Sequence, residues 1–225
     1  MLEACIDSVR KQTYPCTHIL VADGESQDWL TQLSVQHLKL SANHADYGDT
    51  PRGVGSVSAI NQGFDAVTYL DADNWYQTDH IHSLVSLHQR TGAAVCTSRR
   101  NLHRLDGTLL GPCTGVDGER FTDTNCLLLT KIAFEFVPLW WSIPADLHCI
   151  GDRIMWRYIL NKDISRAHSD QTTVAYRTAF KSHYLSFGEK PPPGSKTGEE
   201  IAYAMKRLGD LKQSWNKGAQ HVKHD

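Results

Sequence analysis

Through the first hundred residues, the spacing of apolar side chains switches repeatedly between a helical and a strand pattern. Apolar residues three or four positions apart predict helices, and short apolar runs that end at turn residues predict strands. The predicted helices are 2–14, 29–33, 52–64 and 79–90, and the predicted strands are 18–22, 35–40, 66–70 and 93–97. Strands that alternate with helices in this way indicate an α/β fold, with a mostly parallel central sheet flanked by helices.

The second half of the chain carries fewer regular patterns. It predicts a hairpin over 99–111, a helix over 152–160 and a strand over 172–180. Residues 189–198 contain three consecutive prolines, which indicate an extended linker. A final helix follows, and its apolar side consists of Ile201, Met205, Leu208 and Trp215. We therefore expect one domain over 1–188, then the linker, then a C-terminal helix and tail over 199–225.

The composition is that of a globular protein. With 225 residues, of which 40% are hydrophobic and 21% charged, the chain can bury the core of one domain. A formal net charge of −2 argues against a protein that works by neutralising nucleic-acid phosphates. No apolar run approaches the roughly 18 residues of a membrane span. The six cysteines include no CxxC pair, so reduced thiols and a cytoplasmic protein are expected.

Two sets of side chains each fit two interpretations. The basic residues of the final helix would form a solvated face or a peripheral contact with a membrane or partner; they are Lys206, Arg207, Lys212 and Lys217. The tryptophans of the second half would pack in the core or form a wall on which a sugar stacks; they are Trp140, Trp141 and Trp156.

Two predicted strands end in acidic residues, Asp23 after the first and Asp71-Ala72-Asp73 after the third. In α/β sheets ligands bind beyond the carboxyl ends of the strands, so these acids are candidates for one site. Side chains two residues apart in an extended segment point the same way, about 6.6 Å apart along the chain. Such carboxylates repel each other unless a cation lies between them or one is protonated. The triplet therefore predicts Mg²⁺ or Mn²⁺ bound to a substrate diphosphate, with a solvated turn as the alternative.

Four segments around this triplet share the order of motifs of a known family. They are 2–28 (LEACIDSVRKQTYPCTHILVADGESQD), 52–75 (RGVGSVSAINQGFDAVTYLDADNW), 124–128 (TNCLL) and 151–153 (GDR). Together they resemble the inverting family 2 glycosyltransferases. The resemblance implies the GT-A (nucleotide-diphospho-sugar transferase) fold over 1–188, with a nucleotide-binding half over about 1–99 and an acceptor-binding half over about 100–188.

The resemblance also implies roles for four acids. Asp23 corresponds to a contact with the base or ribose of the nucleotide, and Asp71 to the acid that faces the nucleotide sugar. Asp73 corresponds to the main ligand of a divalent cation, Mn²⁺ or Mg²⁺, on the diphosphate. Asp152 corresponds to the general base that deprotonates the acceptor hydroxyl. Attack opposite the departing diphosphate would invert the anomeric configuration.

Further candidates would bind the diphosphate and its metal. The family has an arginine where this chain has Ile60, and Arg52 is the nearby substitute. Arg177 and Lys181 would form charge-assisted contacts with the diphosphate. His183 would be a further metal ligand, with a solvated loop histidine as the alternative.

The chain departs from the family pattern in two more places. Gly151 stands where the family commonly has a first acid before Asp152. The family begins with a strand and a nucleotide-contacting turn before the first helix, whereas this chain opens within the helix. Either the true start lies upstream of Met1, or this protein lacks a central strand and part of its nucleotide-binding wall. A sheet without that strand would have unpaired backbone groups and exposed apolar area. We therefore expect marginal stability, and turnover by the chain as given is in question.

The resulting hypothesis is a metal-dependent, inverting glycosyltransferase. It would move a sugar from a nucleotide-diphosphate sugar to a hydroxyl of a saccharide or other acceptor. The alternatives are a truncated, catalytically inactive GT-A-like binding module and, third, a sugar nucleotidyltransferase. The last would usually show a glycine-rich, basic phosphate loop near its start, and the sequence contains none.

Overall fold

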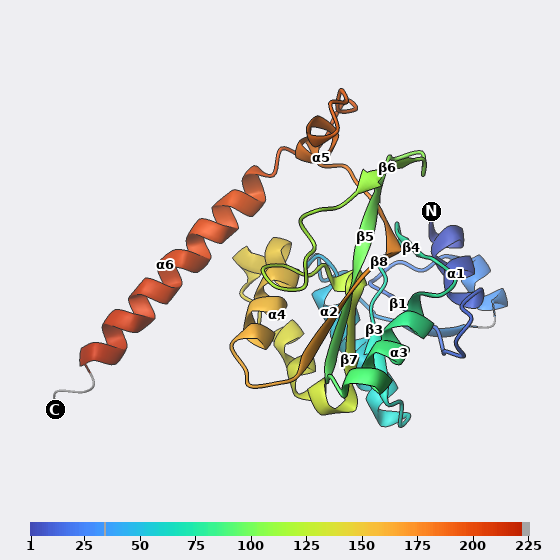
Figure 1. The fold of residues 1–225 in the computed structure, drawn as a ribbon, viewed down its shortest axis with the longest axis horizontal. Helices are drawn as coiled ribbons and strands as arrows, with labels where there is room; N and C mark the ends of the chain where they lie inside the picture. The colour runs from blue at the N-terminus through green and yellow to red at the C-terminus, as the bar shows by residue number, and fades with distance from the viewer. Residues whose placement is uncertain (34, 222–225) are drawn as a thin grey trace.

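The computed structural model describes residues 1–33 and 35–221, with side chains as far as Leu211 (Figure 1). The α-helices are α1 (Leu2–Arg10), α2 (Asp49–Asn61), α3 (His80–Thr91), α4 (Gly151–Leu160), α5 (Lys181–Ser186) and α6 (Glu199–His221). The 3-10 helices are η1 (Asp28–Gln32), η2 (Thr124–Cys126), η3 (Lys131–Trp141) and η4 (Ala145–Ile150). The strands are β1 (Ile19–Ala22), β2 (Gln36–Lys39), β3 (Ala66–Thr68), β4 (Trp75–Tyr76), β5 (Val95–His103), β6 (Leu109–Pro112), β7 (Leu127–Thr130) and β8 (Arg166–Arg177).

The strands form two separate sheets. β1 and β2 make a parallel two-stranded sheet, and the other strands make a six-stranded sheet in the order β3-β7-β5-β8-β4, with β6 paired to β5. Within the larger sheet β5 and β8 run parallel, whereas β3 with β7, β7 with β5, β4 with β8 and β6 with β5 are antiparallel. The predicted α/β architecture is confirmed. The pairing is mixed rather than mostly parallel, because the second half of the chain contributes strands in both directions.

Two strands are longer in the structure than the sequence pattern predicts, because they pair with each other over a long stretch. The predicted strand 93–97 continues to His103, and the predicted strand 172–180 begins earlier, at Arg166. The two strands run side by side from Val95 opposite Arg166 to His103 opposite Arg177. Polar residues in both strands gain backbone partners from this pairing, which apolar periodicity alone does not predict.

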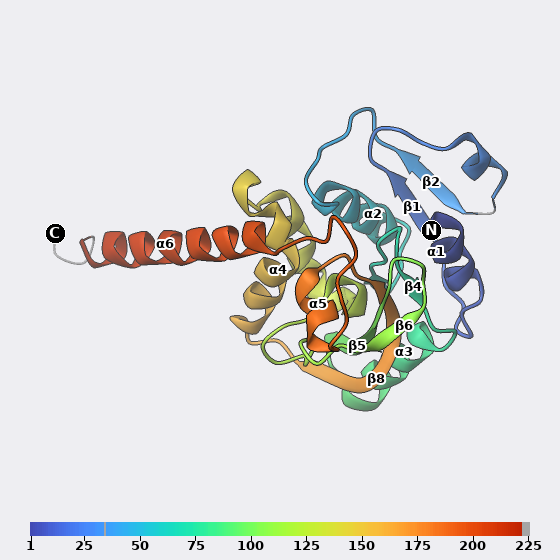
Figure 2. The same ribbon diagram turned by 90° about the horizontal axis from the view of Figure 1, so that it is seen from above.

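A cavity of about 1720 Å³ lies between the two sheets. Its walls include β1 and β3 together with side chains of α1 and α2. α2 connects the two regions, since it packs on β1 from one side and on η3 from the other (Figure 2). The cavity continues from this space to the loop that follows β3, so the candidate site opens onto it.

The main hydrophobic core lies under the six-stranded sheet. Its largest buried side chains come from η3, η4 and α4 and include Trp140, Phe136, Ile150 and Met155. Trp156 is buried in the same core, so two of the three candidate tryptophans are core residues. Trp141 is 46% exposed, and its ring lies against Gly53 so closely that a Cβ there would be 2.5 Å from it.

The C-terminal helix extends away from the rest of the protein (Figures 1 and 2). Its first turns pack on the main core through Ile201, Met205 and Leu208, and Ala204 is fully buried there. The predicted apolar stripe is thus confirmed as far as Leu208, while the side chains of Lys212, Trp215 and Lys217 and the tail 222–225 lie outside the described part. The proline-rich segment is fastened to α5's start, where Lys196 donates its backbone N–H to the Ala179 carbonyl.

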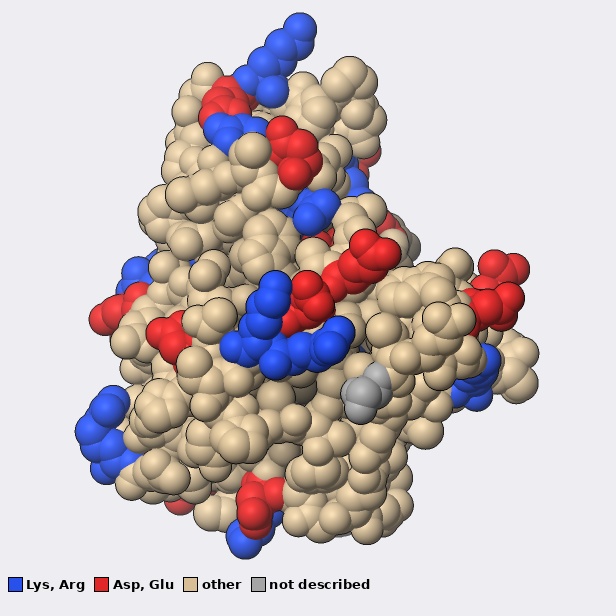
Figure 3. Space-filling model, turned by 90° about the vertical axis from the view of Figure 1, so that its right-hand side faces the viewer, with Lys and Arg blue, Asp and Glu red and all other residues tan. Residues whose placement is uncertain are grey.

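Two surface findings bear on partners. Among the described residues, the helices are all too short or too polar to cross a membrane. On the face shown in Figure 3, Lys and Arg side chains meet Asp and Glu side chains near the middle of the surface, beside a hollow. Positive charge on this face is therefore partly offset, in line with the argument against phosphate neutralisation as the main task.

Candidate functional site

The loop between β3 and β4 carries the acidic triplet. Its turn is closed by a hydrogen bond from the Asn74 N–H to the Asp71 carbonyl (3.0 Å). The buried Asn74 side chain accepts a hydrogen bond from the backbone N–H of Arg177 at 2.8 Å, which ties the loop to the end of β8. The loop is therefore held on both sides of the triplet, at the edge where the strand ends.

Asp71 is held by two polar partners. Arg52, from the second turn of α2, donates from Nη2 to Asp71 Oδ1 at 2.6 Å, and Asn125 donates from Nδ2 to Oδ2 at 2.9 Å. The backbone N–H of Asp71 also donates to Asn125 Oδ1 at 2.7 Å. Burial alone would raise the pKa of Asp71, but the charge of Arg52 and the bond from Asn125 outweigh it and hold the pKa below its usual value.

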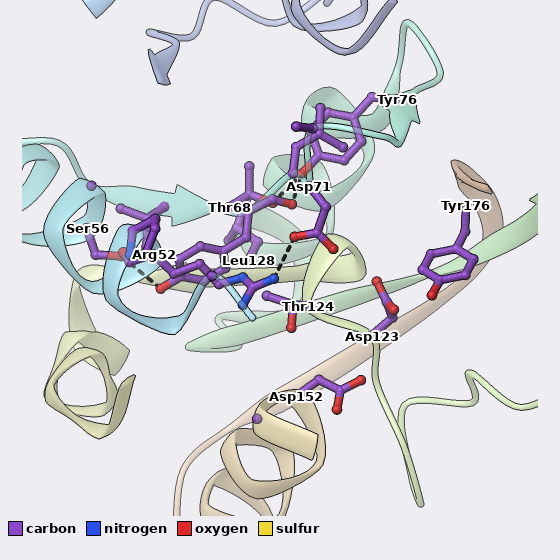
Figure 4. Close-up of a pocket in the computed structure, with 18 of the residues that line it drawn as sticks. Arg52, Ser56, Thr68, Asp71, Tyr76, Asp123, Thr124, Leu128, Asp152 and Tyr176 are labelled. Carbon is purple, nitrogen blue, oxygen red and sulfur yellow. Dashed lines mark hydrogen bonds and ion pairs between the residues drawn. The ribbon is translucent and has the colours of Figure 1, made fainter. Parts of the chain in front are cut away.

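A second carboxylate, Asp123, faces the same space (Figure 4). It forms a buried ion pair with Arg100 of β5, and it accepts hydrogen bonds from both the backbone (2.8 Å) and the side chain (2.7 Å) of Asn125. The Arg100 guanidinium lies 3.9 Å from the centre of the Tyr176 ring. Asn125 thus links Asp71 to Asp123.

Asp123 and Arg100 were not among the site residues predicted from the sequence. Asp123 was visible as an acid immediately before the segment that resembles the family, where it precedes η2 and caps it through the Asn125 N–H. Arg100 carried no signal, since it lies inside a strand whose extent the pattern underestimated. Its importance follows from pairing with a residue 23 positions away.

Asp152 is the second residue of α4 and points toward Asp123 and Asp71 in Figure 4. Its carboxylate accepts a hydrogen bond from the Arg153 N–H at 2.7 Å. Burial, followed by the negative charge of Asp123, raises the pKa of Asp152 to about 6. A carboxyl with this pKa is mainly ionised at pH 7 and accepts a proton more readily than an ordinary aspartate.

Asp73 lies on the exposed side of the loop and also lines the cavity. Although the residue is exposed, surrounding protein desolvates the carboxyl, and this effect together with the charge of Asp71 raises its pKa. A cation placed beside Asp73 would relieve that repulsion. In the part of the chain that the structure describes, no three His, Cys, Asp or Glu side chains converge as a metal cage. The donor set fits an ion held by Asp73 and completed by substrate phosphate and water.

His183 lines the same cavity, but it does not join Asp71 and Asp73 in a ligand cluster. Its Nδ1 is hydrogen-bonded to Thr178 Oγ1 at 2.6 Å. Burial, and then the charge of Arg100, lowers the pKa of His183 to about 4, so the imidazole is neutral at pH 7. The predicted set of three metal ligands is therefore not assembled by the described residues.

The other predicted donor contacts lie apart from the cavity lining. Arg177 donates to the Leu105 carbonyl at 3.1 Å and lies over the Trp75 ring, and Lys181 is exposed at the start of α5. Asp23 follows β1, where His44 donates to it from its backbone N–H at 3.1 Å and its ring Nδ1 lies 2.5 Å away. Lys196, which was not predicted, does line the cavity.

Comparison with known proteins agrees with the fold. Residues 1–141 match the model of "Glycosyl transferase family 2". Among solved structures, the chain is similar to S. aureus TarS 1–349 (TM-score 0.55, 15% identity), covering 82% of this chain and 58% of that one. It is also similar to TarS 1–349 in complex with UDP (TM-score 0.54, 13% identity, 83% and 59% covered). For TarS 1–349 in complex with UDP-GlcNAc the TM-score is 0.55 and the identity 14%, and the match covers 79% of this chain and 54% of that one.

The chain spans somewhat over half of the length of these TarS structures. At this level of identity the likeness shows a shared fold. No curated protein matches the chain in sequence.

Proposed function

The chain belongs to glycosyl transferase family 2, and from this premise we propose that it transfers a sugar from a nucleotide-diphosphate sugar to a hydroxyl group of an acceptor. The observation that carries the proposal is the convergence of Asp71, Asp123 and Asp152 on one cavity, with Arg52 paired to Asp71. Such a site combines acids of different pKa with a fixed positive charge.

We propose a UDP-sugar as the donor. The support is the similarity in fold to S. aureus TarS, which has been solved with UDP and with UDP-GlcNAc. In this chain Asp71 would face the sugar, and Arg52 would lie near the phosphates. The acceptor is proposed only by class, as a saccharide or other molecule with a free hydroxyl.

The chemistry proposed for the chain's own residues is a single displacement. Asp152 takes the proton from the acceptor hydroxyl at its carboxylate, because its pKa of about 6 leaves it ionised yet basic at neutral pH. The hydroxyl oxygen then attacks the anomeric carbon opposite the diphosphate, with inversion. Asp73 would hold the divalent cation, Mn²⁺ or Mg²⁺, which when bound stabilises the negative charge of the leaving diphosphate.

An inactive binding module remains a second candidate. The observation that favours it is that β1 and β2 form a sheet of their own, apart from the six-stranded sheet, because a donor bound between two sheets that are not paired would be less firmly aligned for attack. A sugar nucleotidyltransferase has no such observation in its favour.

Calorimetry with UDP and Mn²⁺, followed by measurement of UDP release from UDP-sugars, tests the proposal. We expect binding that requires Mn²⁺ in the wild type and loss of that binding in Asp73→Asn, because the amide carries no negative charge for the ion. Glu189→Gln is a matched control, since this carboxylate pairs with Arg104 away from the cavity lining. Binding without any turnover across acceptors would favour the binding module, and no binding at millimolar UDP would contradict both.

A further inference from the structure

Arg52 is held between two carboxylates. Its Nη2 donates to Asp71, and its Nη1 lies 3.3 Å from Asp49 Oδ1 and 3.0 Å from the Tyr47 carbonyl oxygen. Asp49 is the first residue of α2, one turn before Arg52, and it is only 1% exposed. A buried carboxylate of this kind requires partners, and Arg52 is one of them.

The second partner of Asp49 comes from η4. His148 Nδ1 is hydrogen-bonded to Asp49 Oδ2 at 2.8 Å. Burial raises the pKa of Asp49 to about 6, while the bond from His148 and the charge of Arg52 act in the opposite direction. The three side chains therefore form one polar group, buried at Asp49 and half-buried at Arg52 and His148, that joins the start of α2 to η4.

Gly151 makes this arrangement sterically feasible. A Cβ added at residue 151 would lie 2.7 Å from Asp49 Oδ1 and 3.0 Å from Oδ2, closer than non-bonded atoms approach. A side chain at residue 151 and the Asp49 carboxylate thus compete for the same space. Gly151 directly precedes Asp152, so this contact also brings α2 against the start of α4 beside the proposed base.

We propose that Asp49 is a positioning residue, whose carboxylate fills the space over Gly151 and holds the Arg52 guanidinium in place toward the donor. The inference rests on the proposed function, because Arg52 acts on a donor only if the chain binds one. Asp49 touches neither donor nor acceptor in this proposal. Without it, Arg52 would keep only Asp71 as an ion-pair partner and would lose its fixed orientation between the two carboxylates.

Kinetics with a UDP-sugar separate this role from a purely structural one. In Asp49→Asn the carboxylate charge is lost with little change of shape, and we expect KM for the donor to rise about tenfold while kcat changes about twofold or less. Gly151→Ala should raise KM similarly, since its Cβ displaces the carboxylate. Asp79→Ala is the control, because Asp79 is an exposed aspartate at the start of α3 with no side-chain capping bond.

A double variant tests whether a carboxylate is needed near Arg52 regardless of whether residue 49 or residue 151 carries it. Asp49→Ala empties the space over residue 151, and Gly151→Glu introduces an acid from the other side. We expect Asp49→Ala/Gly151→Glu to recover KM relative to Asp49→Ala. An unchanged donor KM in both Asp49→Asn and Gly151→Ala, with melting temperatures like the wild type, would overturn the proposal.

A measurement without donor distinguishes failure of this inference from failure of the proposed function. In ¹⁵N NMR spectra, the Arg52 guanidinium should show restricted rotation in the wild type and faster rotation in Asp49→Asn. If rotation is equally restricted in both, Asp49 does not position Arg52, whatever the protein binds. If rotation changes as expected but no nucleotide binds, the positioning role stands and the donor assignment falls.

Discussion

The two sheets that face the cavity differ in how firmly they are held. In the six-stranded sheet, β5 has neighbours on both sides, and its residues Val95 and Cys96 are fully buried. In the two-stranded sheet, β1 pairs with no described strand except β2, and Ile19 to Val21 are partly buried beside the cavity. A strand with one free edge has fewer backbone hydrogen bonds and less apolar contact to lose when it opens.

The candidate chemistry follows the same division. The six-stranded side supplies Asp71 and Asp123, which Asn125 connects through hydrogen bonds of 2.7–2.9 Å. The two-stranded side supplies Asp23, whose recorded partner is the exposed His44. Carboxylates that must meet reacting atoms within fractions of an ångström are better placed on the more rigid wall. We therefore expect the proposed turnover to depend mainly on the six-stranded side.

The largest expected difference is in catalysis. Asp152→Asn should lower kcat by about 10²- to 10⁴-fold, because the amide cannot accept the hydroxyl proton, while binding of UDP is retained. Asp23→Asn, on the other wall, should change kcat by about threefold or less. The rate of UDP release checks both. Losses of equal size would mean that both walls contribute equally to the reaction.

Substitutions of apolar residues should destabilise the protein more in the core under the six-stranded sheet than in the two-stranded sheet. Phe136→Ala, in the fully buried core under the larger sheet, should lower the free energy of unfolding by about 3–5 kcal/mol. Leu20→Ala in β1, beside the cavity, should lower it by about 1 kcal/mol, since the residue is only partly buried. Urea unfolding of the two variants measures the contrast. A larger effect for Leu20→Ala would show that the two-stranded sheet is as well packed as its neighbour.

Local opening should show the difference without any mutation. Backbone amides of β1 and β2 are expected to exchange with solvent through openings that cost less free energy than those of β5 and β8. Hydrogen–deuterium exchange resolved by residue tests this at constant pH. Protection in β1 that matches β5 would contradict the comparison, whereas protection that rises when UDP and Mn²⁺ are added would indicate that the donor bridges both walls.

A further expected difference depends on pH. The pKa of Asp152 is about 6 in the folded protein and about 3.9 in an unfolded chain, so the folded state binds this proton more tightly. Its contribution to stability is full below about pH 4 and is lost as the pH rises through about 6. The melting temperature of Asp152→Asn, relative to the wild type, should therefore increase from pH 4 to pH 7. A difference that does not depend on pH would contradict the raised pKa.

The site could be predicted in part because several of its residues lie within local motifs. Asp71 and Asp73 follow a short apolar strand, and Asp152 lies in the first turn of a helix. All three residues were therefore predicted from the sequence. Arg52 was named as a substitute for a missing arginine, and the structure pairs it with Asp71. Its second partner, Asp49, lies before the predicted helix 52–64, whereas the structure begins α2 at Asp49.

The positions that escaped prediction depend on distant partners. Arg100 could not be recognised because its role follows from an ion pair with Asp123 and from the long pairing of β5 with β8. The His183 ligand and the Arg177 contact stay predictions: His183 Nδ1 is hydrogen-bonded to Thr178, and Arg177 donates to the Leu105 carbonyl.

The amino-acid sequence by itself determined most helices and strands of the first hundred residues, the acidic loop after β3 and the family, because these depend on local periodicity and on short motifs. The tertiary structure decided how the strands pair, where the sheet divides, which basic group balances each acid and how far each pKa moves. Those properties arise from burial and from electrostatic contacts between segments up to a hundred residues apart, which exist only once the chain has folded.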